Sequence, residues 1–319
     1  MSLQDAISRL SSFWAARGCL VLPPCTLEIP GGVLHPDAFF RLLDEEPWRA
    51  AYLQPVRRPL DGRYGRHPSR LARHLQFQVL LKAPGDDARD LYLASLADLG
   101  LELAVHDLRF AEWSWQALSL DAWGLGWHVL IDGLGVSRMT FLQQLAGREL
   151  EPVALEISYG LERLMMAVGR VRNAFELPWA DGGPSYGELW RRDEEELTRY
   201  AAEVADAEAI ERQLALFLES ARRSLDAGLP RFAYEQTVKC LREIDLLETR
   251  RELSIRDREQ RLGQVRDLVL DVAAAYLAAR ARPPAEQPGA VEAQAPAAAP
   301  EKKARTRKRK GSRRAAEKA

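Results

Sequence analysis

An arginine-rich segment at residues 54–70 holds the side chains best suited to chemistry. It places Arg57, Arg58, Arg63, Arg66 and Arg70 among turn-forming residues, directly before an apolar stretch that starts at Gln76. Guanidinium groups bind phosphate oxygens through paired hydrogen bonds and stabilise the negative charge that develops in transfer reactions. The segment therefore indicates a site for a nucleoside triphosphate. A solvated basic loop or a structural ion-pair site is the alternative reading.

A second candidate lies at residues 156–163, where a strand pattern ends at Gly160 and a helix pattern begins. Glu162 and Arg163 fall in the first turn of that helix and would point at whatever lies over the end of the sheet. An arginine there can lay its flat guanidinium on a purine base. The alternative is an ordinary arginine near a helix start, a position that the helix dipole slightly disfavours.

Several other site classes lack their motifs. No Gly-Lys-Ser or Gly-Lys-Thr occurs, and the two Gly-Leu-Gly sequences are too short for a dinucleotide fingerprint. No Gly-x-Ser-x-Gly elbow supports a serine hydrolase. The five histidines show neither helical His-x-x-x-His spacing nor a nearby cysteine, which argues against a zinc site. Three cysteines at unrelated spacings indicate reduced thiols.

The sequence patterns of the elements that must position these residues predict a mixed α+β fold with an antiparallel sheet. Residues 76–81 and 127–131 have strand patterns, and Asp132-Gly133 is a strong turn signal that makes residues 136–142 a hairpin partner of 127–131. The opening helix, with Phe13 and Trp14, and the helix after Gly160 would cover one face of the sheet.

The rest of the chain changes character after residue 185. Apolar residues at helical spacing predict a bundle of three or more antiparallel helices over residues 186–282. Residues 283–300 contain five prolines and seven alanines, which predicts an extended linker. Residues 301–319 carry a net charge of +8, and such a basic block is expected to be disordered. The predicted catalytic domain is therefore residues 1–185.

Composition favours a soluble, cytoplasmic protein. Of its 319 residues, 47% are hydrophobic, yet no run is long enough to span a membrane and no signal peptide precedes the first helix. The formal net charge is −1, but because the tail is basic the remainder is acidic. A polyanionic partner would have to meet local basic patches or the tail.

Taken in order, these segments resemble class II aminoacyl-tRNA synthetases, in which an arginine-rich loop and a Gly-Leu-Glu-Arg junction are motifs 2 and 3. The helix at Phe13-Trp14 and the strand leading to Pro23-Pro24 would be motif 1, at a dimer interface. More closely, the chain resembles the α subunit of bacterial α2β2 glycyl-tRNA synthetases from about residue 3 to 282. The segments that carry this resemblance are Tyr52–Pro55, Arg57–Pro59, Asp61–Gly65, Gln76–Gln78, Ala122–Trp127, Gln143–Gln144 and Tyr159–Arg163.

The resemblance implies that glycine and ATP react to give glycyl-adenylate and pyrophosphate. By position, Arg57 or Arg58 would hold the α-phosphate, and Arg70 or His74 would reach the outer phosphates. Phe77 and Arg163 would sandwich adenine. Arg57, Arg58 and Arg163 would be the catalytic residues, because positioning and charge neutralisation carry this chemistry.

The resemblance also implies a glycine pocket, a metal and partners. Gln78, Trp115, Glu156 and Ser158 would form the pocket, with Glu156 pairing the substrate ammonium. Glu112 and Glu156 are the candidates to hold Mg²⁺. The expected partners are a second α chain, a β subunit in an α2β2 tetramer that supplies most tRNA recognition, and tRNA-Gly, with no membrane contact.

Several positions depart from the family pattern near the expected pocket. Val33 stands where the family usually has threonine, His128 where it has an acid, Arg66-His67 where it has Glu-Asn, and Glu112–Gln116 where it has Glu-Asp-Asn-Trp-Glu. A lost acid removes charge complementarity to an ammonium or a metal ion. Two alternatives therefore stay open: a paralogue that activates glycine or another small amino acid for an acceptor other than tRNA, and a non-catalytic RNA-binding or regulatory paralogue.

Overall fold

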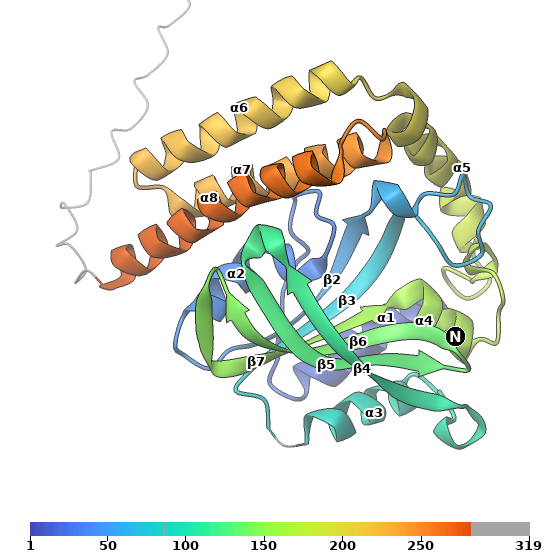
Figure 1. Ribbon diagram of the computed structural model, residues 1–319. Coiled ribbons are helices and arrows are strands. Elements are labelled where there is room, and N and C mark those ends of the chain that lie inside the picture. The colour runs from blue at the N-terminus through green and yellow to red at the C-terminus, as the bar shows by residue number, and fades with distance from the viewer. Residues whose placement is uncertain (86, 282–319) are drawn as a thin grey trace, which may run out of the picture. The chain divides into compact units, whose positions relative to one another are not determined.

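A seven-stranded sheet forms the centre of the protein in its computed structural model, which describes residues 1–85 and 87–281. Its strand order is β1-β2-β3-β7-β6-β5-β4, and every neighbouring pair is antiparallel except β1 and β2, which are parallel. Figure 1 shows the sheet between two layers of helices. The strands are β1 (Leu20–Val21), β2 (Arg49–Arg57), β3 (Arg73–Lys82), β4 (Leu108–Ala117), β5 (Ala122–Ile131), β6 (Leu134–Leu145) and β7 (Arg148–Gly160).

One face of the sheet, here called the opposite face, packs on three helices, of which α3 lies below the sheet in Figure 1. They are α1 (Leu3–Ala15), α3 (Ala88–Asp98) and α4 (Leu161–Val168). Helix α1 begins with a capping box, in which Ser2 and Asp5 satisfy each other's backbone N–H groups. The apolar stripes of α1 and α4 meet alternate residues of β3, β6 and β7, and this packing forms the first hydrophobic core.

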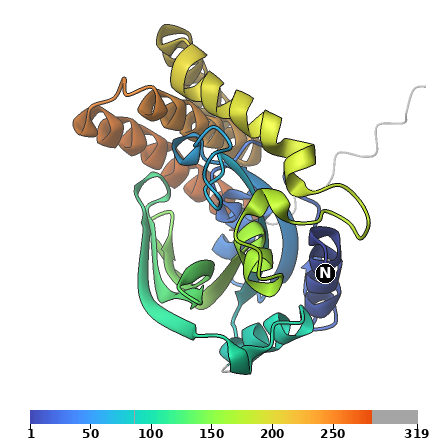
Figure 2. The same cartoon turned by 90° about the vertical axis from the view of Figure 1, so that its right-hand side faces the viewer.

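The other face, here called the cleft face, is partly covered by α2 and by three long helices that form a separate layer in both views (Figure 2). These are α2 (Pro36–Leu43), α6 (Ala207–Asp226), α7 (Pro230–Thr249) and α8 (Ile255–Ala281). Tyr234 of α7 stacks on Phe39 of α2 with ring centroids 4.1 Å apart, and Tyr276 of α8 packs against Phe40. This second hydrophobic core joins the bundle to the sheet.

Helix α5 (Tyr186–Arg199) leads from the sheet layer to the bundle through a π-helical turn at Tyr200–Val204. Its start is fixed by a capping box between Ser185 and Glu188. Residues Met1–Ala281 pack as one compact unit, and the predicted boundary after residue 185 falls inside it and stays a prediction. Five short 3₁₀ turns complete the described elements: Gly32–Leu34, Pro59–Asp61, Leu103–Val105, Leu118–Leu120 and Ala174–Glu176.

The structure confirms the α+β fold and the antiparallel sheet predicted from the sequence. The 127–131 segment pairs with the strand after Asp132-Gly133, whose positive φ values of 50° and 80° belong to a tight hairpin turn. The bundle is present as α5 to α8. The predicted linker and basic tail lie outside the described residues. Within the described part of the chain, no helix has the length and apolar character needed to cross a bilayer.

Candidate active site

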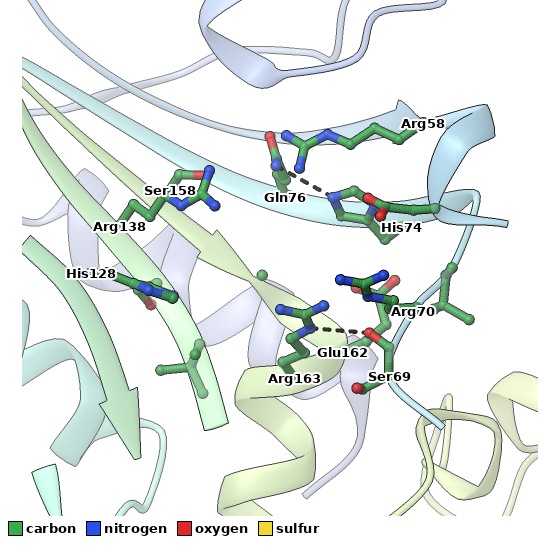
Figure 3. Close-up of a pocket in the computed structure, with 16 residues that line it drawn as sticks. Arg58, Ser69, Arg70, His74, Gln76, His128, Arg138, Ser158, Glu162 and Arg163 are labelled. Atoms are coloured by element: carbon green, nitrogen blue, oxygen red, sulfur yellow. Dashed lines mark hydrogen bonds between the residues drawn. The ribbon is translucent and has the colours of Figure 1, made fainter. Parts of the chain in front are cut away.

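An open cleft lies on the cleft face, at the start of β3 and the end of β7 (Figure 3). Residues from the arginine-rich segment, from four strands and from the start of α4 converge on it. The side chains that bear on its chemistry are Arg58, Asp61, Arg70, His74, Gln76, His128, Arg138, Ser158, Glu162 and Arg163.

The register of the sheet sets one row of side chains across the floor of this region, here called the first row. Tyr52 pairs with Gln78, Gln78 with Ser158, Ser158 with Arg138, and Arg138 with His128. Paired residues of adjacent strands lie on the same face. The first row therefore brings together residues that are up to 106 positions apart in the sequence.

A second row lies two residues further along each strand on the same face. Leu80 pairs with Glu156, Glu156 with Thr140, Thr140 with Gly126, and Gly126 with Trp113. Glu156 is only 8% exposed, and burial raises the pKa of its carboxyl to about 7 even though Arg138 and Gln78 act to lower it. The two rows thus place a buried acid next to polar and cationic side chains.

Four arginines line the cleft, and three of them, Arg58, Arg70 and Arg163, come from the arginine-rich segment and from α4. Arg58 follows strand β2, and its Nε donates to the carbonyl oxygen of Pro30 at 2.7 Å. Arg163 lies in the first turn of α4, and its Nε donates to the carbonyl oxygen of Ser69 at 3.0 Å (Figure 3). Arg70 completes the group. These carbonyl contacts orient the guanidinium groups and leave other N–H donors for an anionic ligand.

Helix α5 holds the arginine-rich segment in place. Glu194 accepts hydrogen bonds from the backbone N–H groups of Ala72 and Arg73. Gly65 has a φ of 63° and passes so close to Arg191 that an added Cβ would lie 3.3 Å from its side chain. The left-handed backbone and the close approach both favour glycine. The bundle side of the molecule therefore positions the loop that carries Arg70.

His74 lies in the cleft between charged neighbours. Burial, with the nearby guanidinium groups of Arg58 and Arg163, lowers the pKa of the imidazole to about 3. The ring is therefore neutral at physiological pH, and one of its nitrogens lies 3.4 Å from the amide nitrogen of Gln76. It can offer hydrogen bonds to a ligand but no positive charge.

A chain of amide contacts fixes Gln78. The backbone N–H of Gly32 donates to Gln76 Oε1 at 3.0 Å, so this oxygen is an acceptor. Gln78 Nε2 then donates to the same oxygen at 3.0 Å and to Ser158 Oγ at 3.1 Å. This orientation leaves the buried Gln78 Oε1 with no donor among the described residues. A buried acceptor without a partner is costly unless a water or a ligand supplies the donor.

The sequence of this chain matches the family described as glycyl-tRNA synthetase alpha subunit over residues 3–281. The chain belongs to this family, and it is a class II aminoacyl-tRNA synthetase chain. Among solved structures it is similar to a crystal structure of pyrrolysyl-tRNA synthetase from Desulfitobacterium hafniense, with 13% identity and a TM-score of 0.39 over 56% of this chain and 73% of that one. A second structure of a pyrrolysyl-tRNA synthetase from the same organism gives 11% identity and a TM-score of 0.40 over the same shares.

Of the residues expected to bind ATP in this synthetase chain, Arg58, Arg70, His74 and Arg163 line the cleft. Arg57 does not. Its side chain is 42% exposed and its Nη1 lies 3.3 Å from the carboxylate of Glu28, which also lies 3.2 Å from Arg242. Between the two neighbouring arginines, the one in the cleft is Arg58.

The structure corrects the expected role of Phe77. This side chain is 0% exposed on the opposite face, where it packs against Tyr159 with ring centroids 6.2 Å apart. Successive residues of a strand point to opposite faces, and Gln76 already points into the cleft. Phe77 therefore belongs to the first hydrophobic core and does not line the cleft.

The expected metal ligands do not share a face. Glu112 is exposed beside Trp127 and Phe141, on the far side of the sheet from Glu156. Among the described residues no group of three or more His, Cys, Asp or Glu side chains is placed to hold a metal ion. The two predicted residues do not fit a shared Mg²⁺, because the sheet lies between them.

The structure brings together three of the four residues of the expected glycine pocket. Gln78 and Ser158 lie in the first row and Glu156 in the second. Trp115 pairs with Gly124, one row beyond Glu156, and packs against the bundle core. The tryptophan in the row of Glu156 is Trp113. It was not predicted from the sequence, and neither was Arg138.

Proposed function

We propose that the cleft catalyses the ATP-dependent activation of glycine, and the observation that carries this proposal is the convergence of Arg58, Arg70 and Arg163 on one cleft, with the buried acid Glu156 close to Arg58. A carboxylate oxygen of glycine attacks the α-phosphorus of ATP. A new O–P bond forms, the bond from the α-phosphorus to the bridging oxygen of pyrophosphate breaks, and pyrophosphate leaves with that electron pair. The products are glycyl-adenylate and pyrophosphate.

ATP would be held by the arginines that line the cleft. Arg58 holds the α-phosphate, where negative charge increases as the pentacoordinate state forms. Arg70 binds the outer phosphates, with hydrogen bonds from neutral His74. Arg163 lays its guanidinium on one face of adenine, and its fixed orientation supports this because the Nε donor is already bonded to Ser69.

Glycine would bind over the two rows of the sheet. The ionised carboxylate of Glu156 pairs with the substrate ammonium, and the unpartnered Gln78 Oε1 accepts one of its N–H groups. Ser158 supplies a hydroxyl at the border between amino acid and phosphate. The backbone of Gly32 lies close to Gln78, since a Cβ added to Gly32 would lie 2.2 Å from the Gln78 side chain, and this contact restricts the position of Gln78.

The complete reaction would transfer glycine to tRNA-Gly together with a β subunit in an α2β2 assembly, as expected for this family. ATP enters as a substrate, and Mg²⁺ would accompany its phosphates. We propose a cytoplasmic location on the same basis.

The test is amino-acid-dependent ATP–pyrophosphate exchange, measured on the full chain alone and with its β subunit, with glycine, alanine and serine. Glycine-specific exchange supports the proposal. A preference for alanine or serine would favour the altered-substrate paralogue, for which His128 in the first row is the supporting observation. Absence of exchange under both conditions would contradict the proposed activity and favour a non-catalytic paralogue.

A further inference from the structure

Arg138 also lines the cleft, but the proposed function gives its positive charge no role. It lies on β6 in the first row, between Ser158 and His128, and it lines the cleft (Figure 3). In that view it stands on the Ser158 side of the cleft, away from Arg70 and Arg163. Its neighbour in the first row, Ser158, belongs to the proposed glycine pocket, so Arg138 lies at the end of the cleft where the amino acid would bind.

The guanidinium of Arg138 is positioned by stacking. It lies over the indole of Trp113, 4.3 Å from the ring centroid, and Trp113 comes from the next row of the sheet. Among the described residues Arg138 makes no side-chain hydrogen bond or ion pair, whereas Arg58 and Arg163 each donate to a carbonyl. A stacked guanidinium keeps its in-plane N–H donors available. Because these donors are partly buried, an acceptor on a ligand would stabilise them.

Charges around Arg138 define what that acceptor would be. Arg58 and Arg163 are near it and disfavour a second cation, while Glu156 is the buried acid in the adjacent row. Adjacent rows on one face are about 7 Å apart along a strand. A zwitterion with its negative end towards Arg138 and its positive end towards Glu156 matches the two opposite charges on these neighbouring rows.

We propose that Arg138 binds the α-carboxylate of the amino-acid substrate and presents it to the α-phosphorus of ATP. The inference rests on the proposed function and assigns a further substrate-binding residue to it. Arg58 is then free to serve the phosphate alone. Paired donors from a fixed guanidinium would also select against amines that lack a carboxylate.

The experiment compares Arg138→Met and Arg138→Lys with the unchanged full chain, together with its β subunit. Arg138→Met keeps much of the side-chain length for packing on Trp113, and Arg138→Lys keeps the charge without the paired donors. Arg109→Met is the matched control, because Arg109 is an exposed arginine on the same sheet that forms an ion pair with Asp107. The readouts are KM for glycine, KM for ATP and kcat in pyrophosphate exchange.

The expected result is that Arg138→Met raises KM for glycine by about 10-fold or more, while KM for ATP changes less than about 2-fold. Arg138→Lys recovers part of the loss, and Arg109→Met matches the unchanged chain. A rise in KM for ATP alone would place Arg138 on the phosphates and overturn the inference. An unchanged or lower KM for glycine would also overturn it, because Arg138 would then serve only as a counter-ion of Glu156.

A binding measurement separates this inference from the proposed function. Calorimetric titration of glycine, and of ethanolamine as an amine without a carboxylate, is carried out in the presence of a non-hydrolysable ATP analogue. If the unchanged chain binds glycine but shows no exchange, the catalytic proposal fails while the role of Arg138 is still tested. Loss of glycine binding in Arg138→Met with ethanolamine unaffected supports the carboxylate role. Equal glycine binding by both proteins, or none by either, overturns it.

Discussion

The two faces of the central sheet carry opposite kinds of side chain on the same strands. On β3, Gln76 and Gln78 point to the cleft face, whereas Phe77 and Val79 are fully buried on the opposite face. The same alternation divides β7, where Ser158 lines the cleft between the core residues Ile157 and Tyr159. Residues that line the cleft and residues that pack against the helices of the opposite face are therefore one position apart in the sequence.

This separation has a consequence for substitutions. A change on the opposite face alters packing against α1 and α4 and should act on the free energy of unfolding. A change on the cleft face alters charge and hydrogen bonding towards a ligand and should act on kinetics. A substitution on one face that changed both the free energy of unfolding and the kinetics would show that the two faces are not fully separate in their effects.

Phe77→Ala should give the largest effect on the opposite face. Truncating a fully buried phenylalanine removes its packing and leaves a cavity, at a cost of about 3–5 kcal/mol in the free energy of unfolding. Urea denaturation followed by circular dichroism measures this. Gln78→Ala, one position away, is the matched control with a smaller expected loss. If Phe77→Ala left stability unchanged and abolished ATP binding, Phe77 would face the nucleotide and the two-face description would be wrong.

Arg58→Gln should give the largest kinetic effect of the two neighbouring arginines. Loss of a charge-assisted contact in the transition state costs about 2–3 kcal/mol, or roughly 100-fold in the exchange rate. Arg57→Gln is its control, and a change of less than about 3-fold is expected because Arg57 pairs with Glu28 outside the cleft. The opposite ranking in steady-state exchange would assign the phosphate contact to Arg57.

The pH dependence of exchange tests Glu156. Its carboxyl has a pKa raised to about 7, so it is neutral below that pH and cannot pair with the substrate ammonium. Activity at low glycine concentration should therefore rise about 10-fold from pH 6 to pH 8, as the carboxylate forms. A profile of kcat/KM for glycine measures the rise. Glu156→Gln should lower activity and remove the pH dependence; a variant that kept the same profile would assign the titration to another group.

Much of this arrangement follows from sequence patterns, and the failures have identifiable causes. The Asp132-Gly133 turn predicted the β5–β6 hairpin, and the apolar spacing over residues 186–282 predicted the bundle, which the structure has as α5 to α8. The expectation for Phe77 failed because it put Phe77 and Gln78 in the same site, although neighbouring residues of a regular strand face opposite ways. Strand alternation alone could have revealed that conflict.

Arg138 could not be placed from the sequence by the same rule. A register shift between Val129 and Leu130 inserts one extra position into the hairpin, so His128 pairs with Arg138 where a regular ladder would pair it with Ser137. Such a bulge changes which face of β6 meets the cleft. The choice between Arg57 and Arg58 was equally open, because the strand ends at Arg57 and alternation no longer applies beyond it.

The smallest expected effect concerns the contact between the bundle and β2. Glu28 bridges Arg57 and Arg242 of α7, but all three side chains are partly exposed. Partly exposed ion pairs contribute about 0–1 kcal/mol, so Glu28→Gln should change the free energy of unfolding by less than about 1 kcal/mol. Ile244→Val, which trims a buried methyl group of the same helix, should cost about 1 kcal/mol or somewhat more. The free energies of unfolding of both variants, measured by denaturation at low and at high salt, show which substitution costs more stability. A larger, salt-sensitive loss in Glu28→Gln would mean that charge, and not the shared apolar core, joins the bundle to β2.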